Sequence, residues 1–482
     1  MKTGKVWLIG AGPGDPGLLT CRGREILENA EVVVYDRLAG DGVLALMPRN
    51  AKHINVGKEG GRHPIPQRQI EKIIVEEALA GNRVVRLKGG DSFLFGRGGE
   101  ELEALIEHGI PYEVIPGVTS AIAAPECAGI PVTHRGIAQS LHIITAHTRE
   151  GGIAPQDYEA LSKLRGTLLF LMGATAVPGI CAGLLDNGYD PATPAAAVEW
   201  GTAAHQRTLI STLAELTADA ATFGLHSPAI IIVGPVAALA RKFAWREKLP
   251  LNGLKVLVTR PRKRQGRLSR MLRDAGAEVI EFPVIETVPL NTTIPSLDAE
   301  WLAFTSATGV ETFFNALAAQ NLDVRAIGSA KIAAIGPTTA DALRARGLKT
   351  DLVPEVYDSL HLARELADTA AGGRIITFRA QNGSPELGDT LRAAKANFTE
   401  IPLYRTETLP APFAPRDVDA VLFTSASTVR GLKSACPDLP IPLACCIGQQ
   451  TAAEARRHGI TNIRVAAKAT LEALIDTLKE SR

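Results

Sequence analysis

The sequence has little of several features that mark particular protein classes. Its six cysteines form no CxxC pair and have no histidine at ligand spacing, which disfavours a zinc site or a disulfide framework. We therefore expect inert thiols, no metal and a cytoplasmic protein. Its apolar runs are too short to span a bilayer. Basic and acidic side chains number 52 and 51, so no global charge attracts nucleic acid or an anionic membrane.

What the sequence does contain is an alternation of short β-rich runs with helical windows, which predicts an α/β fold. Its length of 482 residues and 46% hydrophobic content favour several compact domains. Apolar spacing predicts helices over 18–30, 67–80 and 98–109. The predicted strands of the first half cover residues 5–10, 31–36, 83–89, 141–146, 167–172, 195–200 and 229–234.

A polar segment over 246–253 interrupts this alternation with Pro250 and Gly253, just before a new predicted strand at 255–259. We therefore predict two domains, 1–245 and 254–482, joined by a linker at 246–253.

The second half contains an internal repeat. AFTSATGVETFF (303–314) resembles LFTSASTVRGLK (422–433), and AAIGPTTADALRARG (333–347) resembles CCIGQQTAAEARRHG (445–459). Because both segments recur in the same order, we expect two similar α/β lobes with a cleft between them.

The first half has three glycine-containing loops. GAGPGDPG (10–17) follows the first strand, and two others lie at 86–101 and 116–135. The first loop has GxGxG spacing with two prolines instead of GxGxxG, which argues against nicotinamide dinucleotide binding. Glycine allows the backbone to approach a ligand closely at such turns.

Together these loops resemble the uroporphyrinogen-III C-methyltransferases of the tetrapyrrole methylase family. The matching motifs are GAGPGDPGLLT, VVYDRL, VGKEGGRH, RLKGGDSFLFGRGGEE, PGVTSAIAAPECAGIPVTHR and FLMG, in family order over about 1–240. The resemblance implies two α/β lobes with S-adenosylmethionine in the groove between them. The implied cofactor-binding residues are Pro13, Gly89, Gly90, Asp91, Leu94, Thr119, Ser120, Met172 and Gly201.

The resemblance also implies that Asp36 is the proton acceptor and Lys58 the proton donor. From the residues alone, Asp36 could instead cap a turn and Lys58 could be a solvated cation. The sequence departs from the family pattern at Ser92, Cys127, Ala146 and Leu171, which puts the shape of the pocket in question.

The second half opens with eight cations against one acid over 255–274. Such a cluster could bind an anionic substrate, form a solvated helix face or contact nucleic acid.

Here the chain resembles uroporphyrinogen-III synthase, through VLVTRP, FTSATGV, IGPTTADAL, LYRTE, LFTSAS and IGQQTA over about 254–478. The family implies two flavodoxin-like lobes, 254–288 plus 405–482 and 289–404. It also implies that the substrate is hydroxymethylbilane, a linear tetrapyrrole with eight carboxylates, and that no cofactor is needed. Tyr404 would assist loss of hydroxide, unless it is only a packing residue. The implied substrate-binding residues are Arg260, Ser306, Thr339, Ser425 and Thr451, with Gln450 departing from the family pattern.

The two resemblances imply one bifunctional enzyme, which closes hydroxymethylbilane to uroporphyrinogen III and methylates that product twice to precorrin-2. The product would serve sirohaem or cobalamin synthesis, and the methylase half would form a homodimer. The alternative is another tetrapyrrole methylase fused to a non-catalytic, two-lobed anion-binding module.

Overall fold

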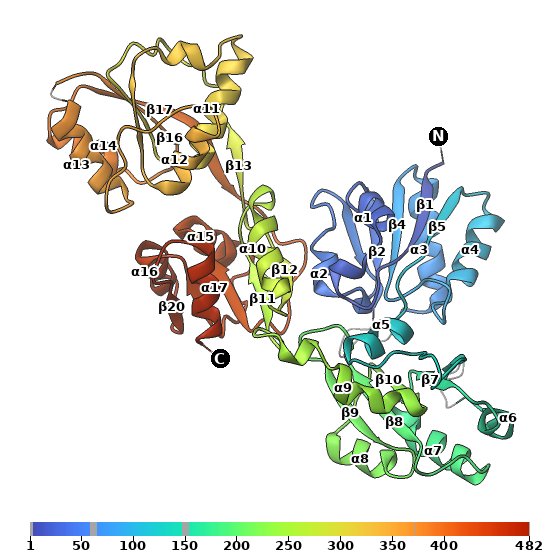
Figure 1. Ribbon diagram of the computed structural model, residues 1–482. Coiled ribbons are helices and arrows are strands. Elements are labelled where there is room, and N and C mark those ends of the chain that lie inside the picture. Colours follow the sequence, from blue (N-terminus) through green and yellow to red (C-terminus); the bar gives the residue numbers. More distant parts are fainter. Residues whose placement is uncertain (1–2, 58–64, 147–153, 371, 482) are drawn as a thin grey trace. The chain divides into compact units, whose positions relative to one another are not determined.

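The computed structural model describes residues 3–57, 65–146, 154–370 and 372–481. They form two compact units, Met1–Val284 with Pro410–Arg482 and Ile285–Leu409. The first unit contains three five-stranded sheets and the second contains one (Figure 1). The predicted α/β class is confirmed.

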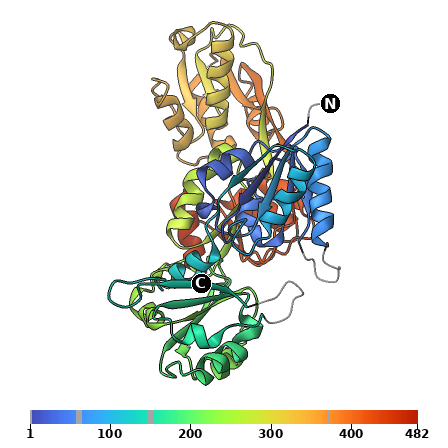
Figure 2. The same ribbon diagram turned by 90° about the vertical axis from the view of Figure 1, so that its right-hand side faces the viewer.

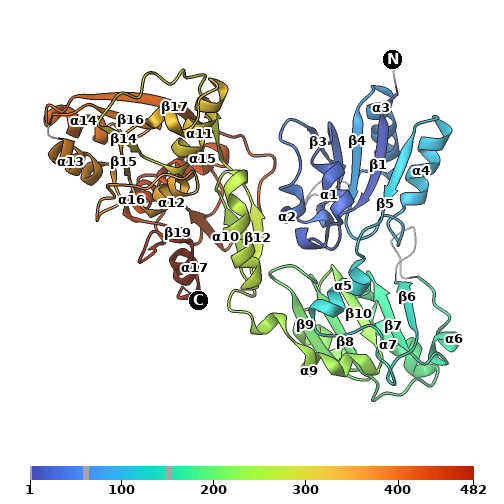
Figure 3. The ribbon, with the colours of Figure 1, turned by 45° about the horizontal axis from the view of Figure 1, so that its top comes forward.

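The first sheet is built from the N-terminal residues of the first unit. Its elements are β1 (Lys5–Gly10), α1 (Cys21–Leu27), β2 (Val32–Tyr35), α2 (Asp41–Leu44), β3 (Lys52–Asn55), α3 (Gln67–Leu79), β4 (Arg83–Lys88), α4 (Gly98–Glu107) and β5 (Tyr112–Ile115). All five strands are parallel, in the order β3-β2-β4-β1-β5. Side chains alternate along β4, so Val85 packs with α1 and α2 while Val84 packs with α3 and α4. The sheet therefore lies between two helical layers (Figure 3).

The second sheet follows along the chain. Its elements are α5 (Ser120–Cys127), β6 (Leu141–Thr145), α6 (Tyr158–Ser162), β7 (Thr167–Leu171), α7 (Val177–Asp186), β8 (Pro194–Glu199), β9 (Arg207–Thr212), α8 (Leu216–Phe223), β10 (Ala229–Val233) and α9 (Ala240–Phe243). The strand order is β6-β7-β10-β8-β9, and β10 is antiparallel to both β7 and β8. Consequently β7 and β8 end at the same edge. Helices α5 and α9 cover one face and α7 and α8 the other.

The predicted linker is in contact with the structured parts of the first unit. Arg246 is buried and donates a hydrogen bond to the carbonyl of Thr202 at 2.7 Å. Leu251 is fully buried in the core of the third sheet. The segment therefore connects the two halves through packed residues, and the domain limits stay a prediction.

The third sheet combines residues from both ends of the second half. Its elements are β11 (Lys255–Val258), α10 (Arg262–Asp274), β12 (Glu278–Glu281), β18 (Ala420–Phe423), α15 (Ala426–Ala435), β19 (Ala444–Cys446), α16 (Gln449–Arg457), β20 (Ile463–Val465) and α17 (Leu471–Lys479). Its strands are all parallel, in the order β12-β11-β18-β19-β20. This is the 2-1-3-4-5 order of flavodoxin-like folds.

The second unit, yellow to orange in Figure 2, contains the fourth sheet. Its elements are β13 (Ile285–Pro289), β14 (Trp301–Phe304), α11 (Ala307–Ala319), β15 (Lys331–Ala334), α12 (Pro337–Arg344), α13 (Ser359–Ala370), β16 (Ile375–Ala380), α14 (Glu386–Ala393) and β17 (Phe398–Thr408). The order is β13-β17-β16-β14-β15, with only β13 antiparallel. Because β13 pairs with the end of β17, residues 285–288 and 405–408 belong to this sheet, whereas the sequence assigned them to the other lobe.

The internal repeat is visible in the backbone. Ser306 and Ser425 cap α11 and α15 with nearly the same φ, −167° and −168°, and each side chain accepts a hydrogen bond from the backbone N–H three residues later. Gly336 and Gly448 precede α12 and α16 with φ of −178° and −173°. The repeated sequences therefore form equivalent strand–turn–helix units.

Three glycines close the loops at the carboxyl-terminal edge of the first sheet. A Cβ built on Gly117 would lie 2.3 Å from the carbonyl oxygen of Gly90 and 2.6 Å from the Cα of Gly10. Real Cβ atoms do not approach backbone so closely. The loops after β1, β4 and β5 can therefore meet only because Gly10 and Gly117 lack side chains.

We expect Gly117→Ala to force these loops apart and to destabilise the protein by about 1 to 3 kcal/mol, the usual cost of overpacking. Gly99→Ala is the matched control, because a Cβ on Gly99, in α4, would meet no atom within 4 Å. This control should be neutral or stabilising by up to about 1 kcal/mol, since alanine is the better helix former. Equilibrium urea unfolding measures both, and equal stability of the two variants would contradict the close-approach argument.

Candidate functional site

The resemblance-derived residues of the first half gather at one edge of the first sheet. Parallel strands end together, so the loops after β1, β2, β4 and β5 lie at this edge. They carry Pro13, Asp36, the Gly89–Asp91 turn and Thr119. Thr119 caps α5 by accepting a hydrogen bond from the backbone N–H of Ala121 at 3.2 Å, and Ser120 begins that helix.

Asp91 holds two of these loops together. Its Oδ1 accepts from the backbone N–H groups of Phe93 and Leu94 at 2.8 and 3.0 Å, and its Oδ2 accepts from that of Gly117 at 3.0 Å. Both carboxylate oxygens are thus engaged within the protein. Asp91 shapes the edge, and the loop backbones form its surface.

The second sheet contributes Met172 and Gly201. Met172 directly follows β7, and Gly201 lies two residues after the end of β8. Met172 has a φ of 56° and is 45% exposed, so this residue is accessible at the strand end. The Thr202 hydroxyl donates to the carbonyl of Pro13 at 3.3 Å. This bond joins the edge of the second sheet to the first glycine loop.

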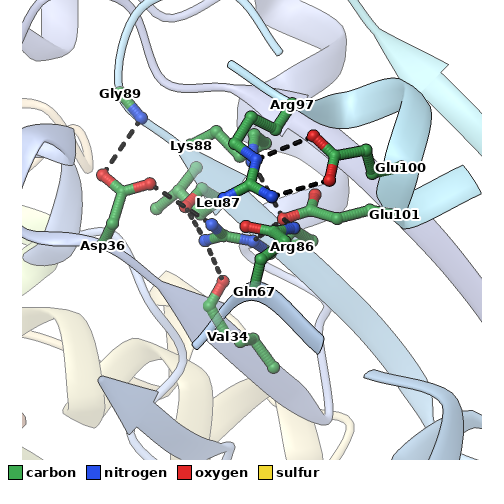
Figure 4. A network of polar contacts seen from close by, with 10 residues as sticks. All are labelled: Val34, Asp36, Gln67, Arg86, Leu87, Lys88, Gly89, Arg97, Glu100 and Glu101. Carbon is green, nitrogen blue, oxygen red and sulfur yellow. Dashed lines mark hydrogen bonds and ion pairs between the residues drawn. The ribbon is translucent and has the colours of Figure 1, made fainter. Parts of the chain in front are cut away.

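Asp36 follows β2 and faces a charged network (Figure 4). Its Oδ1 accepts from the backbone N–H groups of Leu38 and Gly89 at 3.2 and 3.3 Å, so it does cap a turn. Its Oδ2 lies 3.5 Å from a terminal nitrogen of Arg86. The side chain is 26% exposed, so part of it is accessible from solvent.

Arg86 and Lys88 are two residues apart on β4 and lie on the same face of the sheet. Both cations are buried and both donate to Oε1 of Glu101 on α4, at 3.0 and 2.9 Å (Figure 4). Burial, and then the charge of Arg86, lower the pKa of Lys88. The two cations are balanced by Glu101 and Asp36, so this network fixes the direction of the Asp36 carboxylate.

The sequence analysis missed this network. The available signal was the presence of Arg86 and Lys88 inside an otherwise apolar predicted strand, because buried cations require a partner. The same view shows Arg97 donating two hydrogen bonds to the carboxylate of Glu100, at 2.7 and 2.6 Å (Figure 4). Lys58, the implied proton donor, lies outside the described residues.

The departures from the family pattern lie mostly below the surface. Ser92, Ala146 and Leu171 are buried, and Leu94 packs against the core of the second sheet. Burial raises the pKa of the Cys127 thiol. Substitutions at buried positions change how the edge packs, and they add no new charged group to it.

The second unit carries Tyr404, Ser306 and Thr339. The hydroxyls of Tyr404 and Ser306 are 2.8 Å apart, and Ser306 Oγ also accepts from the backbone N–H of Gly309 at 2.9 Å. Only 3% of Thr339 is exposed, whereas the preceding Thr338 is exposed. Thr338 is therefore the threonine of this turn with more surface for a ligand.

The first unit carries Arg260, Ser425 and Thr451. Arg260 is half-buried beyond the end of β11, and Ser425 shares a hydrogen bond with Ser427 at 2.8 Å between hydroxyl oxygens. Thr451 is buried, whereas Gln450, which replaces the commoner threonine, is exposed. The two units therefore present equivalent turns with different exposed side chains.

Three cations of the basic stretch at 255–274 form ion pairs with carboxylates outside that stretch. Lys255 is buried and pairs with Asp41 at 2.7 Å and with Glu278 at 3.6 Å. Burial opposes its charge, yet these carboxylates raise the pKa of Lys255. Arg267 and Arg273 form ion pairs with Glu472 and Glu281. Lys255 at least is therefore a structural cation of this stretch.

Within the ranges that the structure covers, no group of three or more His, Cys, Asp or Glu side chains is arranged to hold a metal ion. No helix in those ranges has both the length and the apolar character needed to cross a membrane.

The fold and the two sets of site residues define a tetrapyrrole methylase joined to a uroporphyrinogen-III synthase domain. Residues 5–217 match the family model of Tetrapyrrole (Corrin/Porphyrin) Methylases, and 266–476 match that of Uroporphyrinogen-III synthase HemD. The chain is 42% identical to the porphyrin biosynthesis protein HemD of Ruminiclostridium josui, over 100% of this chain and 98% of that protein. It belongs to the family of such two-domain porphyrin biosynthesis proteins.

Two further relatives resemble parts of the chain. The uroporphyrinogen-III C-methyltransferase of Bacillus subtilis is 41% identical over 74% of each protein. The crystal structure of uroporphyrin-III C-methyl transferase from Thermus thermophilus, complexed with S-adenosyl homocysteine, is 38% identical, covering 49% of this chain and 100% of that chain with a TM-score of 0.43.

We expect Glu101→Gln to lower the free energy of unfolding by about 3 to 5 kcal/mol, because it removes the carboxylate that both buried cations contact at hydrogen-bond distance. Glu100→Gln is the matched control, since its partner Arg97 and Glu100 itself are partly exposed, and such surface pairs contribute about 0 to 1 kcal/mol. Urea unfolding followed by circular dichroism compares the two variants. A loss of less than about 1 kcal/mol in Glu101→Gln would show that the network is not a buried ion pair.

Proposed function

We propose that this chain is a bifunctional enzyme of tetrapyrrole synthesis. Its second half closes hydroxymethylbilane to uroporphyrinogen III with inversion of the last ring, and its first half transfers two methyl groups from S-adenosylmethionine to that product, giving precorrin-2. The observation that carries the proposal is the presence of both family domains, in order, on one chain that aligns along its full length with a porphyrin biosynthesis protein.

The edge of the first sheet fits S-adenosylmethionine. Gly10 and Gly117 let the backbones of three loops, including that of Gly90, pack against one another, and the cofactor is proposed to lie on the main-chain surface that these loops form. Met172, Gly201 and the Thr119 cap add groups from the adjoining second sheet and α5. When bound, S-adenosylmethionine supplies an electrophilic methyl group on a sulfonium.

The residues of this edge then have to orient the pyrrole and handle its proton. When a ring carbon of the substrate gains a methyl cation, charge balance requires the substrate to release one proton from another position, and Asp36 presents a carboxylate for it. Two backbone N–H groups and Arg86 hold that carboxylate in one orientation. Lys58 is proposed as the proton donor from the family pattern.

The second half needs no cofactor, because ring closure breaks the C–O bond of the hydroxymethyl end, forms a C–C bond to the ring at the other end and releases a proton, so that water is lost overall. Ser306 can donate its proton to the Tyr404 oxygen while still accepting from Gly309. The phenol proton of Tyr404 then remains available for the leaving hydroxide. Arg260, Ser425, Thr339 and Thr451, or the more exposed Thr338 and Gln450, are proposed to contact the substrate.

A homodimer formed through the methylase half and a cytoplasmic location are also part of the proposal, and both rest on the family resemblance. The product is proposed to enter sirohaem or cobalamin synthesis.

We expect Asp36→Asn to slow methyl transfer about 10²- to 10⁴-fold, the usual contribution of an acid–base group. S-adenosylmethionine affinity should be unchanged, because the amide oxygen still accepts the two backbone hydrogen bonds. Methylation of supplied uroporphyrinogen III gives the rate, and calorimetry gives the affinity. Asp157→Asn is the control, since Asp157 also caps a helix but lies at α6. Equal rates for the two variants would remove Asp36 from the mechanism.

We expect the intact chain to convert hydroxymethylbilane to the type III isomer. Spontaneous closure gives the type I isomer, so a type I product alone would favour a non-catalytic anion-binding module. Tyr404→Phe keeps the buried ring and removes only the hydroxyl, and we expect it to raise the type I fraction. Chromatography of the oxidised porphyrins measures that fraction under limiting enzyme. Methylation of supplied uroporphyrinogen III should not change, and a parallel fall would point to general misfolding.

A further inference from the structure

A small cavity lies in the second unit at the carboxyl-terminal edge of its parallel strands. Its volume is about 180 Å³.

 The cavity of the second unit is smaller than the ~300 to 1,000 Å³ of most small-molecule sites, so it suits one substituent of a larger ligand. Its polar lining comes from Thr305, Ser359, Arg379, Ser384 and Tyr404.

These polar groups come from segments that the parallel sheet brings to one place. Thr305 directly follows β14, and Arg379 lies near the end of β16. Ser359 begins α13, a helix of twelve residues, and Ser384 precedes α14. The N-terminus of α13 is already occupied by Asp358, which accepts from the backbone N–H of His361, so the guanidinium of Arg379 is the group of this cavity that favours an anion.

Arg379 is the cation of this cavity, and its side chain is only 11% exposed. It pairs with Oε1 of Glu400 at 2.6 Å and donates to the carbonyl of Ser384. A guanidinium has five N–H donors, so these two contacts leave donors for a ligand. Glu400 also lies 3.9 Å from Arg392, and Asp358, next to Ser359, accepts from His361. The nearby carboxylates are therefore already paired.

We propose that this cavity binds one carboxylate side chain of the linear tetrapyrrole, with Arg379 as the cation that receives it. The inference rests on the proposed synthase function. Tyr404 lines the same cavity, so a carboxylate held there fixes the substrate beside the phenol. Arg379 thereby acts as a specificity-determining residue of ring closure.

The test compares two variants that break the same ion pair. Arg379→Gln removes the cation, and we expect the KM for hydroxymethylbilane to rise about ten- to a hundredfold, as for loss of a charged hydrogen bond. Glu400→Gln keeps the cation and removes its competing carboxylate, so KM should stay the same or fall. If the ion pair is only structural, both variants should lose activity alike.

Arg374→Gln is a further control, because Arg374 lies just before β16, at the opposite end of that strand from Arg379. It should leave KM unchanged. If Arg379→Gln does not fold, Arg379→Lys and Glu400→Gln decide the matter. The proposal predicts a raised KM only in the lysine variant, which retains charge but loses the planar fork, and a raised KM in Glu400→Gln would overturn it.

The wild-type reaction separates this inference from the function on which it rests. If the intact chain yields no type III isomer, the synthase function fails. If it yields type III and Arg379→Gln keeps the wild-type KM, only the carboxylate site fails. Methylation of supplied uroporphyrinogen III should be normal in every variant.

Discussion

In a parallel sheet every strand ends at the same edge, and the loops that follow the strands are gathered there. The first and third sheets are wholly parallel, and β14 to β17 of the fourth sheet are parallel as well. In the second sheet, β10 makes β7 and β8 run the same way. Residues far apart in sequence, such as Pro13 and Thr202, therefore meet at one place. Both proposed sites depend on this geometry.

Buried charge is used differently in the two halves. On β4 the buried charges carry a desolvation cost. Apolar side chains of similar volume would avoid this cost and often give a protein that is at least as stable. The charges instead orient a side chain, because Arg86 contacts both the buried Glu101 and the partly exposed Asp36. On β11, Lys255 is enclosed by Asp41 and Glu278 and faces no proposed ligand. A buried cation is therefore no indication of a site until its partners are known.

The sequence predicted the central strands well, because strands buried on both faces read as continuous apolar runs. It missed β3, β5 and β9, which are edge strands with few buried residues. It also missed the end of β17, since nothing local shows that residues 405–408 pair with β13.

For the sites, glycine loops and helix caps could be read from local patterns, because they depend on neighbouring residues. Ion pairs between residues far apart in the sequence could not be predicted from local patterns. The partner of Lys255 is 214 residues away, and that of Arg379 is 21 residues away. The motif IGPTT also did not reveal that its second threonine, Thr339, points into the protein while Thr338 is exposed.

The net charge of +1 bears on how an octacarboxylate is selected. No long-range field distinguishes it from other anions, so recognition has to arise from local contacts. Arg379 is held by Glu400, which offsets its charge while the cavity is without substrate. A single small anion therefore gains little binding free energy from Arg379. A substrate with eight carboxylates can make several such contacts at once. Each contact after the first forms within the same complex, so the binding free energies of the contacts accumulate. Weak, paired cations spread over the fold thus favour the large polyanion over small ones.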